Sequence, residues 1–310
     1  MSSAGSIRSR VKSRVERRLD KAAQVFLDDP ALLKVDFSEP AGEPALAGPD
    51  SVSWRIFKNP VSLFIGGVTA VILEFAEPRV RSGVWENSTF RTDPVRRLKR
   101  TGHAAMITVY GARSISRRMI AGVNRMHGRV AGVTPSGDPY AASDPELLNW
   151  VQSTAAFGFL EAYSAYVAPL SDAEKSRYYS ESQTAAGLYG CVNPPKSVAE
   201  QQALFAAMSP HLEGSDIIFE FLSIMKKAAA FPQPAQLAQH SLVRAAVDLA
   251  PPEIRSVLGL DRSYGLRPFE RRIVARMARR ADRLMLRSGP AVQACRRVGL
   301  ADDYLYPRAR

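Results

Sequence analysis

Four histidines are the only side chains that could give an imidazole nitrogen to a metal or a cofactor: His103, His127, His211 and His240. His127 follows Val123 by four residues and precedes Val130 by three, and this helical spacing places its imidazole on an apolar stripe. Such a histidine can be a hydrogen-bonded core residue or an axial ligand, and spacing leaves both interpretations open. A haem needs one proximal nitrogen beside an apolar space, whereas zinc or non-haem iron needs several ligands. The histidine count therefore permits haem and disfavours a metal site built from several histidines.

A second group of polar residues also has helical spacing. Asp93, Arg97 and Thr101 follow one another at intervals of four, and Arg100 lies three residues after Arg97. On a solvated face, Asp93 and Arg97 would form an ion pair worth about 0.3–0.5 kcal/mol. On an inward face, the same residues would form a positive strip, with a hydroxyl group, beside a cofactor. Periodicity does not choose between these two faces.

Other common catalytic sites lack their sequence signatures. The chain has no GxxxxGK[ST] phosphate loop, no GxGxxG dinucleotide motif, no GxSxG nucleophile elbow and no HExxH zinc motif. No glutamate stands three residues before a histidine, which excludes the ferritin-like di-iron pattern. Cys191 and Cys295 form neither CxxC nor CxxCH, so we expect no covalently attached haem. This cysteine usage fits a reducing cytoplasm.

Several short motifs follow one another through the middle of the chain. They are Gly66-Gly67, Pro78, Gly83-Val84, Ser88-x-Phe90-x-x-Asp93-Pro94-x-x-Arg97-Leu98-x-Arg100-Thr101, Gly111, Met126-His127-x-x-Val130-x-Gly132 and Tyr140-x-x-x-Asp144-Pro145-Glu146-Leu147-x-x-Trp150-Val151. In this order the motifs resemble the catalytic domain shared by the MpaB-type oxygenases and the latex-clearing proteins, which are rubber oxygenases. The resemblance covers roughly residues 54 to 287. It implies an all-α protein that binds haem b.

The resemblance also implies roles for individual residues. His127 takes the place of the proximal haem ligand, and so of the ligand to the metal. Arg97 and Thr101 take the places of an arginine and a threonine near the haem, and Arg100 stands where rubber oxygenases carry a basic distal residue. Gln152 stands where many relatives have a histidine. Its helical stripe is otherwise apolar, so we expect it to face the cofactor, although an amide cannot ligate iron as histidine does.

Glu77 stands directly before Pro78, where many relatives also have a histidine. One interpretation is a solvated residue at a helix end, because proline disfavours helix at the residue before it. The other is a partly buried carboxylate with a raised pKa, able to take a proton from an allylic carbon of the substrate. Both interpretations stay open.

The elements that must position these residues have helical spacing almost throughout. Hydrophobic residues at 46% and charged residues at 23% are typical of a globular chain. No segment shows a sustained period of two, so we predict an all-α fold. The apolar run 61–73 is shorter than the ~20 residues of a membrane span and predicts a buried helix. Helix starts or helices are predicted at Asp93-Pro94, 114–132, Asp144-Pro145, the capping boxes of Ser171 and Ser197, 215–229, 233–249 and 268–287.

The domain organisation follows from the same patterns. We expect a single large helical domain with a buried haem pocket at residues 54–290. A basic amphipathic helix is expected at 1–30, a surface linker rich in Pro and Gly at 31–53, and a C-terminal tail at 291–310.

The formal net charge of +12 is concentrated at the two ends of the chain. Residues 1–21 carry seven basic against two acidic side chains, and residues 262–310 carry thirteen arginines against four acidic side chains. Solvated helix faces would account for this, and so would contact with an anionic membrane. We expect a cytoplasmic protein with peripheral contact to an anionic membrane. No nucleic-acid partner is expected, because the arginine-rich end has no recognition motif.

These observations and the resemblance predict a haem b-dependent oxygenase that acts with dioxygen on an apolar small molecule of the isoprenoid type. The alternative is a non-catalytic haem- or lipid-binding helical protein. That alternative is indicated if Glu77 and Gln152 mark a lost active site.

Overall fold

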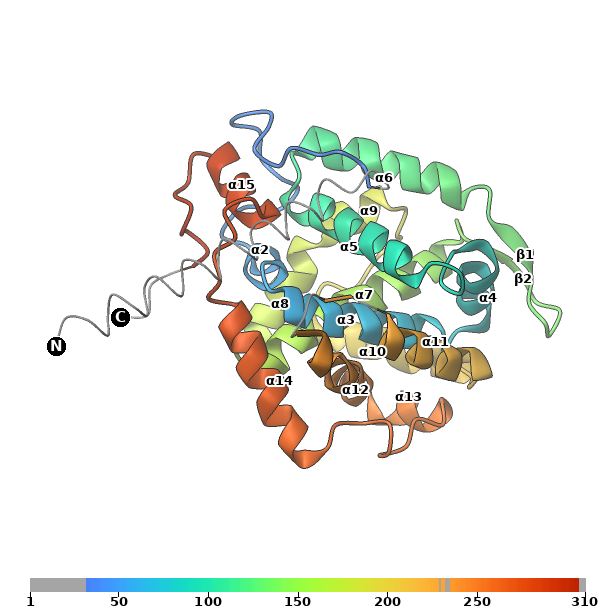
Figure 1. Cartoon of the computed structure of the whole chain (residues 1–310). Coiled ribbons are helices and arrows are strands. Elements are labelled where there is room, and N and C mark those ends of the chain that lie inside the picture. The colour runs from blue at the N-terminus through green and yellow to red at the C-terminus, as the bar shows by residue number, and fades with distance from the viewer. Residues whose placement is uncertain (1–31, 229, 232–234, 307–310) are drawn as a thin grey trace.

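The computed structural model describes residues 32–228, 230–231 and 235–306, which form a helical body with one short hairpin (Figure 1). The all-α prediction is confirmed. In chain order the elements are α2 (Val52–Phe57), α3 (Pro60–Glu74), α4 (Pro78–Asn87), α5 (Pro94–Tyr110), α6 (Arg113–His127), β1 (Ala131–Val133), β2 (Pro139–Ala141), α7 (Pro145–Tyr166), α8 (Asp172–Glu181), α9 (Gln183–Leu188), α10 (Val198–Met208), η1 (Ser209–His211), α11 (Asp216–Lys227), η2 (Ala235–Ala238), α12 (Gln239–Leu249), α13 (Pro252–Val257), α14 (Pro268–Ala281) and α15 (Pro290–Arg297).

Helices α3 and α7 form the centre of the body (Figure 1). Their backbones touch, because a Cβ added to Gly66 of α3 would lie 2.7 Å from the Gly158 carbonyl oxygen of α7. Thr69 of α3 donates a hydrogen bond to the Ala246 carbonyl of α12 at 3.0 Å. Asn59, the N-cap of α3, donates one to the Ala278 carbonyl of α14 at 2.9 Å. These contacts fix the position of α3 and therefore that of its last residue, Glu74.

The predicted helix starts are present where local hydrogen bonds can form them. Asp93 caps α5 by accepting from the Arg96 amide, and Asp144 caps α7 by accepting from the Glu146 amide. The Ser171 capping box is complete. At Ser197 only half of the box forms, because the Glu200 carboxylate accepts from the Lys196 amide instead of the Ser197 amide.

Three helices are shorter in the structure than the sequence pattern predicts. The predicted helix 114–132 ends at His127, and the chain then forms the antiparallel β1–β2 hairpin, in which Gly132 pairs with Tyr140. Gly137 in the connecting turn has φ +97°, a conformation that glycine adopts without strain. Helix α12 begins at Gln239 rather than at 233. Helix α14 ends at Ala281, where Asp282 pairs with Lys58 at 2.9 Å rather than continuing the helix.

The segment predicted as a surface linker lacks regular structure from residue 32 to 51 but packs on the body. Phe37 is completely buried. Arg297 of α15 donates to the Phe37 carbonyl at 2.6 Å and to the Glu43 carbonyl at 2.8 Å. The ring of His103 on α5 is hydrogen-bonded to the Leu33 carbonyl at 2.8 Å. The predicted tail likewise contains most of α15, in which Cys295 is buried, whereas the predicted N-terminal helix 1–30 lies outside the described residues.

No single helix in the described ranges combines the length and the apolar character needed to cross a membrane. Helices α3 and α4 meet those two criteria only as a pair, and that pair is bent by 115°.

Candidate functional site

Arg97 of α5 is the residue around which the candidate site is built. Its guanidinium lies over the Phe90 ring, 5.1 Å from the ring centroid, and donates a hydrogen bond to the Thr101 hydroxyl one turn later. The Thr101 hydroxyl in turn donates to the Arg97 carbonyl at 3.0 Å. The pKa of Arg97 lies below its ordinary value, mainly because of burial, while Glu74 opposes this change and Arg100 adds to it. Arg97 is therefore fixed by an aromatic ring and a hydroxyl group, beside a carboxylate.

His127 is the last residue of α6 and is partly buried. Burial lowers the pKa of its imidazole below 6.5, and the positive charge of Arg97 lowers that pKa further. The imidazole is therefore neutral at pH 7, which is the form that binds metals. Its Nδ1 is buried and has no hydrogen-bond partner among the described residues.

Glu74, the last residue of α3, is a member of the site that the sequence reading missed. Burial raises the pKa of its carboxyl group to about 7, and the nearby Arg97 charge opposes that rise. The signal in the sequence was the position of Glu74 directly after the apolar run 61–73. That position predicts a carboxylate at the end of a buried helix, but not the residues that surround it.

Glu77 begins α4 as its N-cap and is 1% exposed, so the solvated interpretation is wrong. Its Oε2 accepts from the Val80 amide at 2.7 Å and its Oε1 from Arg79 Nε at 2.6 Å. Arg79 also pairs with Glu146 of α7 at 3.0 Å. Oε2 therefore caps α4, and Oε1 helps to join α4 to α7 through Arg79 and Glu146.

The remaining predicted residues lie on α5 and α7. Arg100 and Thr101 are exposed, and Thr101 is tied to Arg97 as described above. Gln152 is partly buried on α7, and its amide makes no hydrogen bond within the described part of the chain. The structure thus brings Arg97 within electrostatic range of His127 and Glu74 and ties Thr101 to Arg97, whereas Arg100 and Thr101 lie at the surface instead of on the expected inward face. The functional role of each of these residues stays a prediction.

The helices that carry these residues each present a stripe that neighbouring residues cover only in part. The stripes of α3 and α7 adjoin, because a Cβ on Gly67 would lie 3.8 Å from the Phe159 ring. The partly buried stripes are Gly67, Val71 and Glu74 on α3; Met119, Val123 and His127 on α6; and Leu148, Gln152, Ala155 and Phe159 on α7. The stripe of α6 that carries His127 is otherwise apolar.

The donor set fits a haem held by one nitrogen. A buried ring nitrogen without a partner is a polar atom that a bound group or its surroundings can satisfy. No three His, Cys, Asp or Glu side chains gather into a metal-binding group in the residues that the structure describes. His127 is therefore the residue that would hold the iron, with Arg97 as the nearby positive charge.

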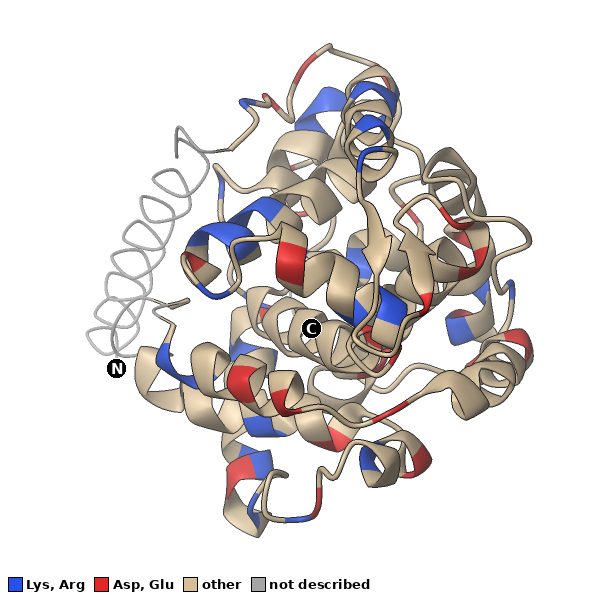
Figure 2. Ribbon diagram, turned by 90° about the vertical axis from the view of Figure 1, so that its right-hand side faces the viewer, with Lys and Arg blue, Asp and Glu red and all other residues tan. Residues whose placement is uncertain are grey.

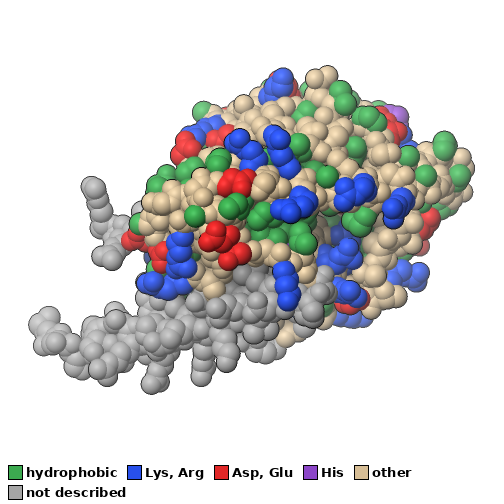
Figure 3. Space-filling model, turned by 90° about the horizontal axis from the view of Figure 1, so that it is seen from above, with side chains coloured by type: hydrophobic (Ala, Val, Ile, Leu, Met, Phe, Trp, Pro, Cys, Tyr) green, Lys and Arg blue, Asp and Glu red, His purple; other side chains and the backbone are tan. Residues whose placement is uncertain are grey.

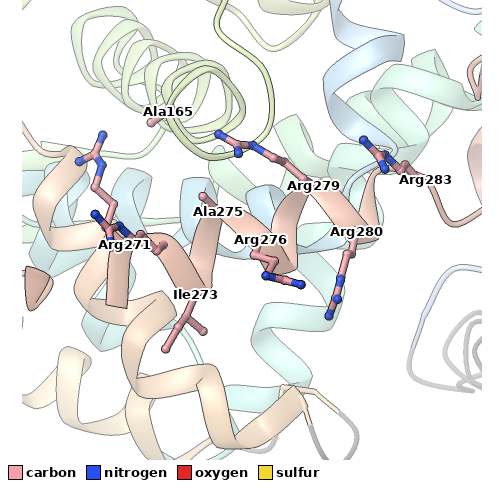
Figure 4. A pocket seen from close by; sticks show the side chains of 9 residues that line it. Ala165, Arg271, Ile273, Ala275, Arg276, Arg279, Arg280 and Arg283 are labelled. Carbon is pink, nitrogen blue, oxygen red and sulfur yellow. The ribbon is translucent and has the colours of Figure 1, made fainter. Parts of the chain in front are cut away.

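Two surface depressions lie away from this site. One, of about 830 Å³, runs along α14 and is lined mainly by arginines (Figure 4). The other, of about 410 Å³, lies between α4 and the loop before α11, where Arg81 and Glu213 form an ion pair. Neither contains a residue of the candidate site.

Comparison with known proteins gives one result. Residues 54–283 match the family described as "ER-bound oxygenase mpaB/B'/Rubber oxygenase, catalytic domain". No curated protein and no solved structure gave a significant match.

Proposed function

The chain belongs to the family of the mpaB and rubber oxygenase catalytic domains, and from this premise we propose that it is a haem b-dependent oxygenase. It acts with dioxygen on an apolar small molecule, of which an isoprenoid is the type we expect. The observation that carries the proposal is the position of Arg97, whose charge acts on the neutral His127 imidazole and on the Glu74 carboxyl group. We also propose a cytoplasmic location with peripheral membrane contact.

Two residues have separable tasks in this proposal. His127 holds the iron through its neutral imidazole, and haem bound there supplies the redox chemistry of dioxygen activation. Arg97, oriented by Phe90 and Thr101, stabilises negative charge that develops on the reacting oxygen atoms. Its burial strengthens this effect, because there is less water to screen the charge.

A carboxylate near the site would hold and release the substrate proton. Glu77 is the carboxylate that the sequence suggested, but the Val80 amide and Arg79 occupy its oxygens. Glu74, with a pKa of about 7, can exchange a proton near neutral pH. Glu74 and Glu77 are therefore the two candidates for this role.

The first experiment measures haem retention. The purified protein is expected to show a Soret band after reconstitution with haem b, and His127→Ala is expected to lose it because the proximal nitrogen is gone. His211→Ala and His240→Ala are matched controls, since both side chains are exposed and distant in sequence from the site. Full haem occupancy in His127→Ala would overturn the assignment of the ligand.

The second experiment measures oxygen uptake with an isoprenoid such as squalene. General-base assistance is worth ~100- to 10,000-fold in rate. Replacement of the carboxylate that serves as the base by Gln is therefore expected to lower the rate of oxygen uptake by about that factor, while haem content is unchanged. Glu74→Gln and Glu77→Gln are compared side by side. A haem-loaded protein that consumes no oxygen with any apolar substrate would instead favour the non-catalytic binding protein, for which Gln152 in place of a histidine is the indication.

A further inference from the structure

Helix α14 and the turn that follows it carry a cluster of arginines that the proposed site does not use. We name the cluster the α14 arginine face, and it consists of Arg272, Arg276, Arg279, Arg280 and Arg283, all exposed. None of the five forms an ion pair with a carboxylate in the described part of the chain. They line the depression along α14, together with Ala165 of α7 (Figure 4).

The acidic residues of this region point away from the arginine face. Glu270 is buried, where it accepts from the Ser241 hydroxyl at 3.1 Å and from the Arg267 amide at 2.8 Å. Asp282 pairs with Lys58 at 2.9 Å. Val274 and Ala278 lie on the buried side of the same helix. The charges of α14 are therefore sorted, with carboxylates inward and guanidinium groups outward.

Two apolar side chains stand among these arginines. Phe269 is 59% exposed and Ile273, one turn later, is 51% exposed. At 100° per residue, both lie on the outer side of α14, next to Arg272, Arg276 and Arg280. An exposed face that combines arginines with large apolar residues is typical of a helix that lies in a membrane interface.

We propose that the α14 arginine face docks on an anionic lipid bilayer. The guanidinium groups bind lipid headgroup phosphates, which they can grip with paired hydrogen bonds, and Phe269 and Ile273 enter the boundary between headgroups and acyl chains. This inference assigns the membrane contact expected of the basic C-terminal region to one helix face. It does not depend on the proposed oxygenase function. The two exposed apolar side chains favour a bilayer over a nucleic acid, whose backbone offers them no apolar layer.

The hairpin end of the body does not show this separation (Figure 2). Basic and acidic residues both occur around the hairpin end of the body (Figure 2). On the side seen from above, Lys and Arg lie among acidic and hydrophobic side chains (Figure 3). Helix α6 also exposes Arg117, Arg118 and Arg125, on the opposite side of the body from α14 (Figure 1). Those three arginines therefore serve as a matched control.

The main experiment is sedimentation of the full chain with phosphatidylcholine vesicles, with and without phosphatidylserine. We expect binding only with phosphatidylserine, weakening as salt rises because screening shortens the range of the charges. Each basic residue near such a surface contributes about fivefold. The triple change Arg272→Gln, Arg276→Gln, Arg280→Gln is therefore expected to weaken binding about 100-fold. The same change at Arg117, Arg118 and Arg125 leaves the docking face intact and is expected to weaken it far less.

A fluorescent probe tests whether the apolar residues enter the lipid. Both native cysteines are buried, so Ile273→Cys can be labelled selectively with an environment-sensitive dye. Its emission is expected to rise and shift to the blue on phosphatidylserine vesicles, while the same dye at Arg117→Cys is expected to change little.

Three results would overturn the proposal. They are absence of binding at low salt, an equal loss of binding in the two arginine triples, and an unchanged dye signal at residue 273 on bound protein. Tighter binding to duplex DNA than to the vesicles, with no effect of Phe269→Ser and Ile273→Ser, would also overturn it and identify a nucleic-acid surface. None of these readouts needs haem or turnover, so failure here and failure of the oxygenase proposal are distinguishable.

Discussion

The positive charge of Arg97 lowers the pKa of two neighbouring groups, the His127 imidazole and the Glu74 carboxyl group. Burial lowers the pKa of the His127 imidazole and the Arg97 charge lowers it further, and the same charge opposes the effect of burial on the pKa of the Glu74 carboxyl group. Burial outweighs the Arg97 charge at Glu74, so the folded protein holds the Glu74 proton more tightly than the unfolded chain does. Stability is therefore linked to pH through this one residue.

Titration of Glu74 makes the folded protein less stable as the pH rises. The pKa of Glu74 is about 7 in the folded state, against an ordinary value of 4.5. Between these values the unfolded chain has lost its proton while the folded protein retains it, so the free energy of unfolding falls as the pH rises from 4.5 to 7. Below that window Glu74 is protonated in both states, and above it the loss is complete. The full shift corresponds to roughly 3 kcal/mol as an upper limit.

Glu74→Gln is therefore expected to remove this pH-dependent loss. Urea unfolding should show nearly equal stability of the variant and the parent near pH 4.5, and an advantage for the variant that grows to as much as about 3 kcal/mol by pH 8. Glu253→Gln, an exposed residue of α13, is the control. Parallel pH profiles for Glu74→Gln and the parent would contradict the burial of this carboxylate.

At the scale of elements, the contact between α3 and α7 decides where Glu74 and Gln152 lie. The two backbones touch at Gly66 and Gly158, and a methyl group at either position meets backbone atoms that cannot rotate away. Overpacking of this kind costs about 1–3 kcal/mol. The glycines are required by this close approach and not by a special backbone angle.

Gly66→Ala is accordingly expected to lower the free energy of unfolding by about 1–3 kcal/mol in a denaturant titration. Gly102→Ala on α5 is the matched control, because no atom lies within 4 Å of its added methyl group. That change is expected to stabilise the protein by up to about 1 kcal/mol, since alanine is the better helix former. A neutral result for Gly66→Ala would mean that α3 and α7 can separate.

For the whole molecule, the segment 32–51 and helix α15 close the body from opposite ends of the described chain. Phe37 is completely buried, and Arg297 holds the carbonyl groups of Phe37 and Glu43. Burial of Arg297 lowers the pKa of its guanidinium, and the Glu43 charge opposes that change. The described segment 32–51 and helix α15, both outside the matched range 54–283, are thus part of the packed body.

Phe37→Ala is expected to lower the free energy of unfolding by about 3–5 kcal/mol, because it leaves a cavity in a packed region. Phe269→Ala removes the same side chain from a position that is 59% exposed, and it is expected to cost less than about 0.5 kcal/mol. Denaturant melts of the two variants make the comparison. Equal losses would show that the segment 32–51 does not contribute to the core.

The sequence alone determined the features that depend on neighbours in the chain. Helical spacing gave the all-α class, and the caps Asp93, Asp144 and Ser171 placed three helix starts, because a capping side chain bonds an amide two or three residues away. The helix predicted from the sequence extends past the end of α6, because the spacing of Val130 still fits a helix. In the structure, pairing of Gly132 with Tyr140 places these residues in a hairpin. The ordered motifs also identified the family and singled out His127 and Arg97.

Only the tertiary structure decided which residues meet. Glu74 ends α3, Arg97 lies on α5 and His127 ends α6, and no local pattern relates these three positions. In the structure Glu77 is the N-cap of α4, and the expected linker packs against Arg297. The physical reason is that burial and charge are properties of the surroundings. A carboxylate acquires a pKa of about 7 from helices distant in the sequence, and those helices take their places through contacts such as Gly66 against Gly158.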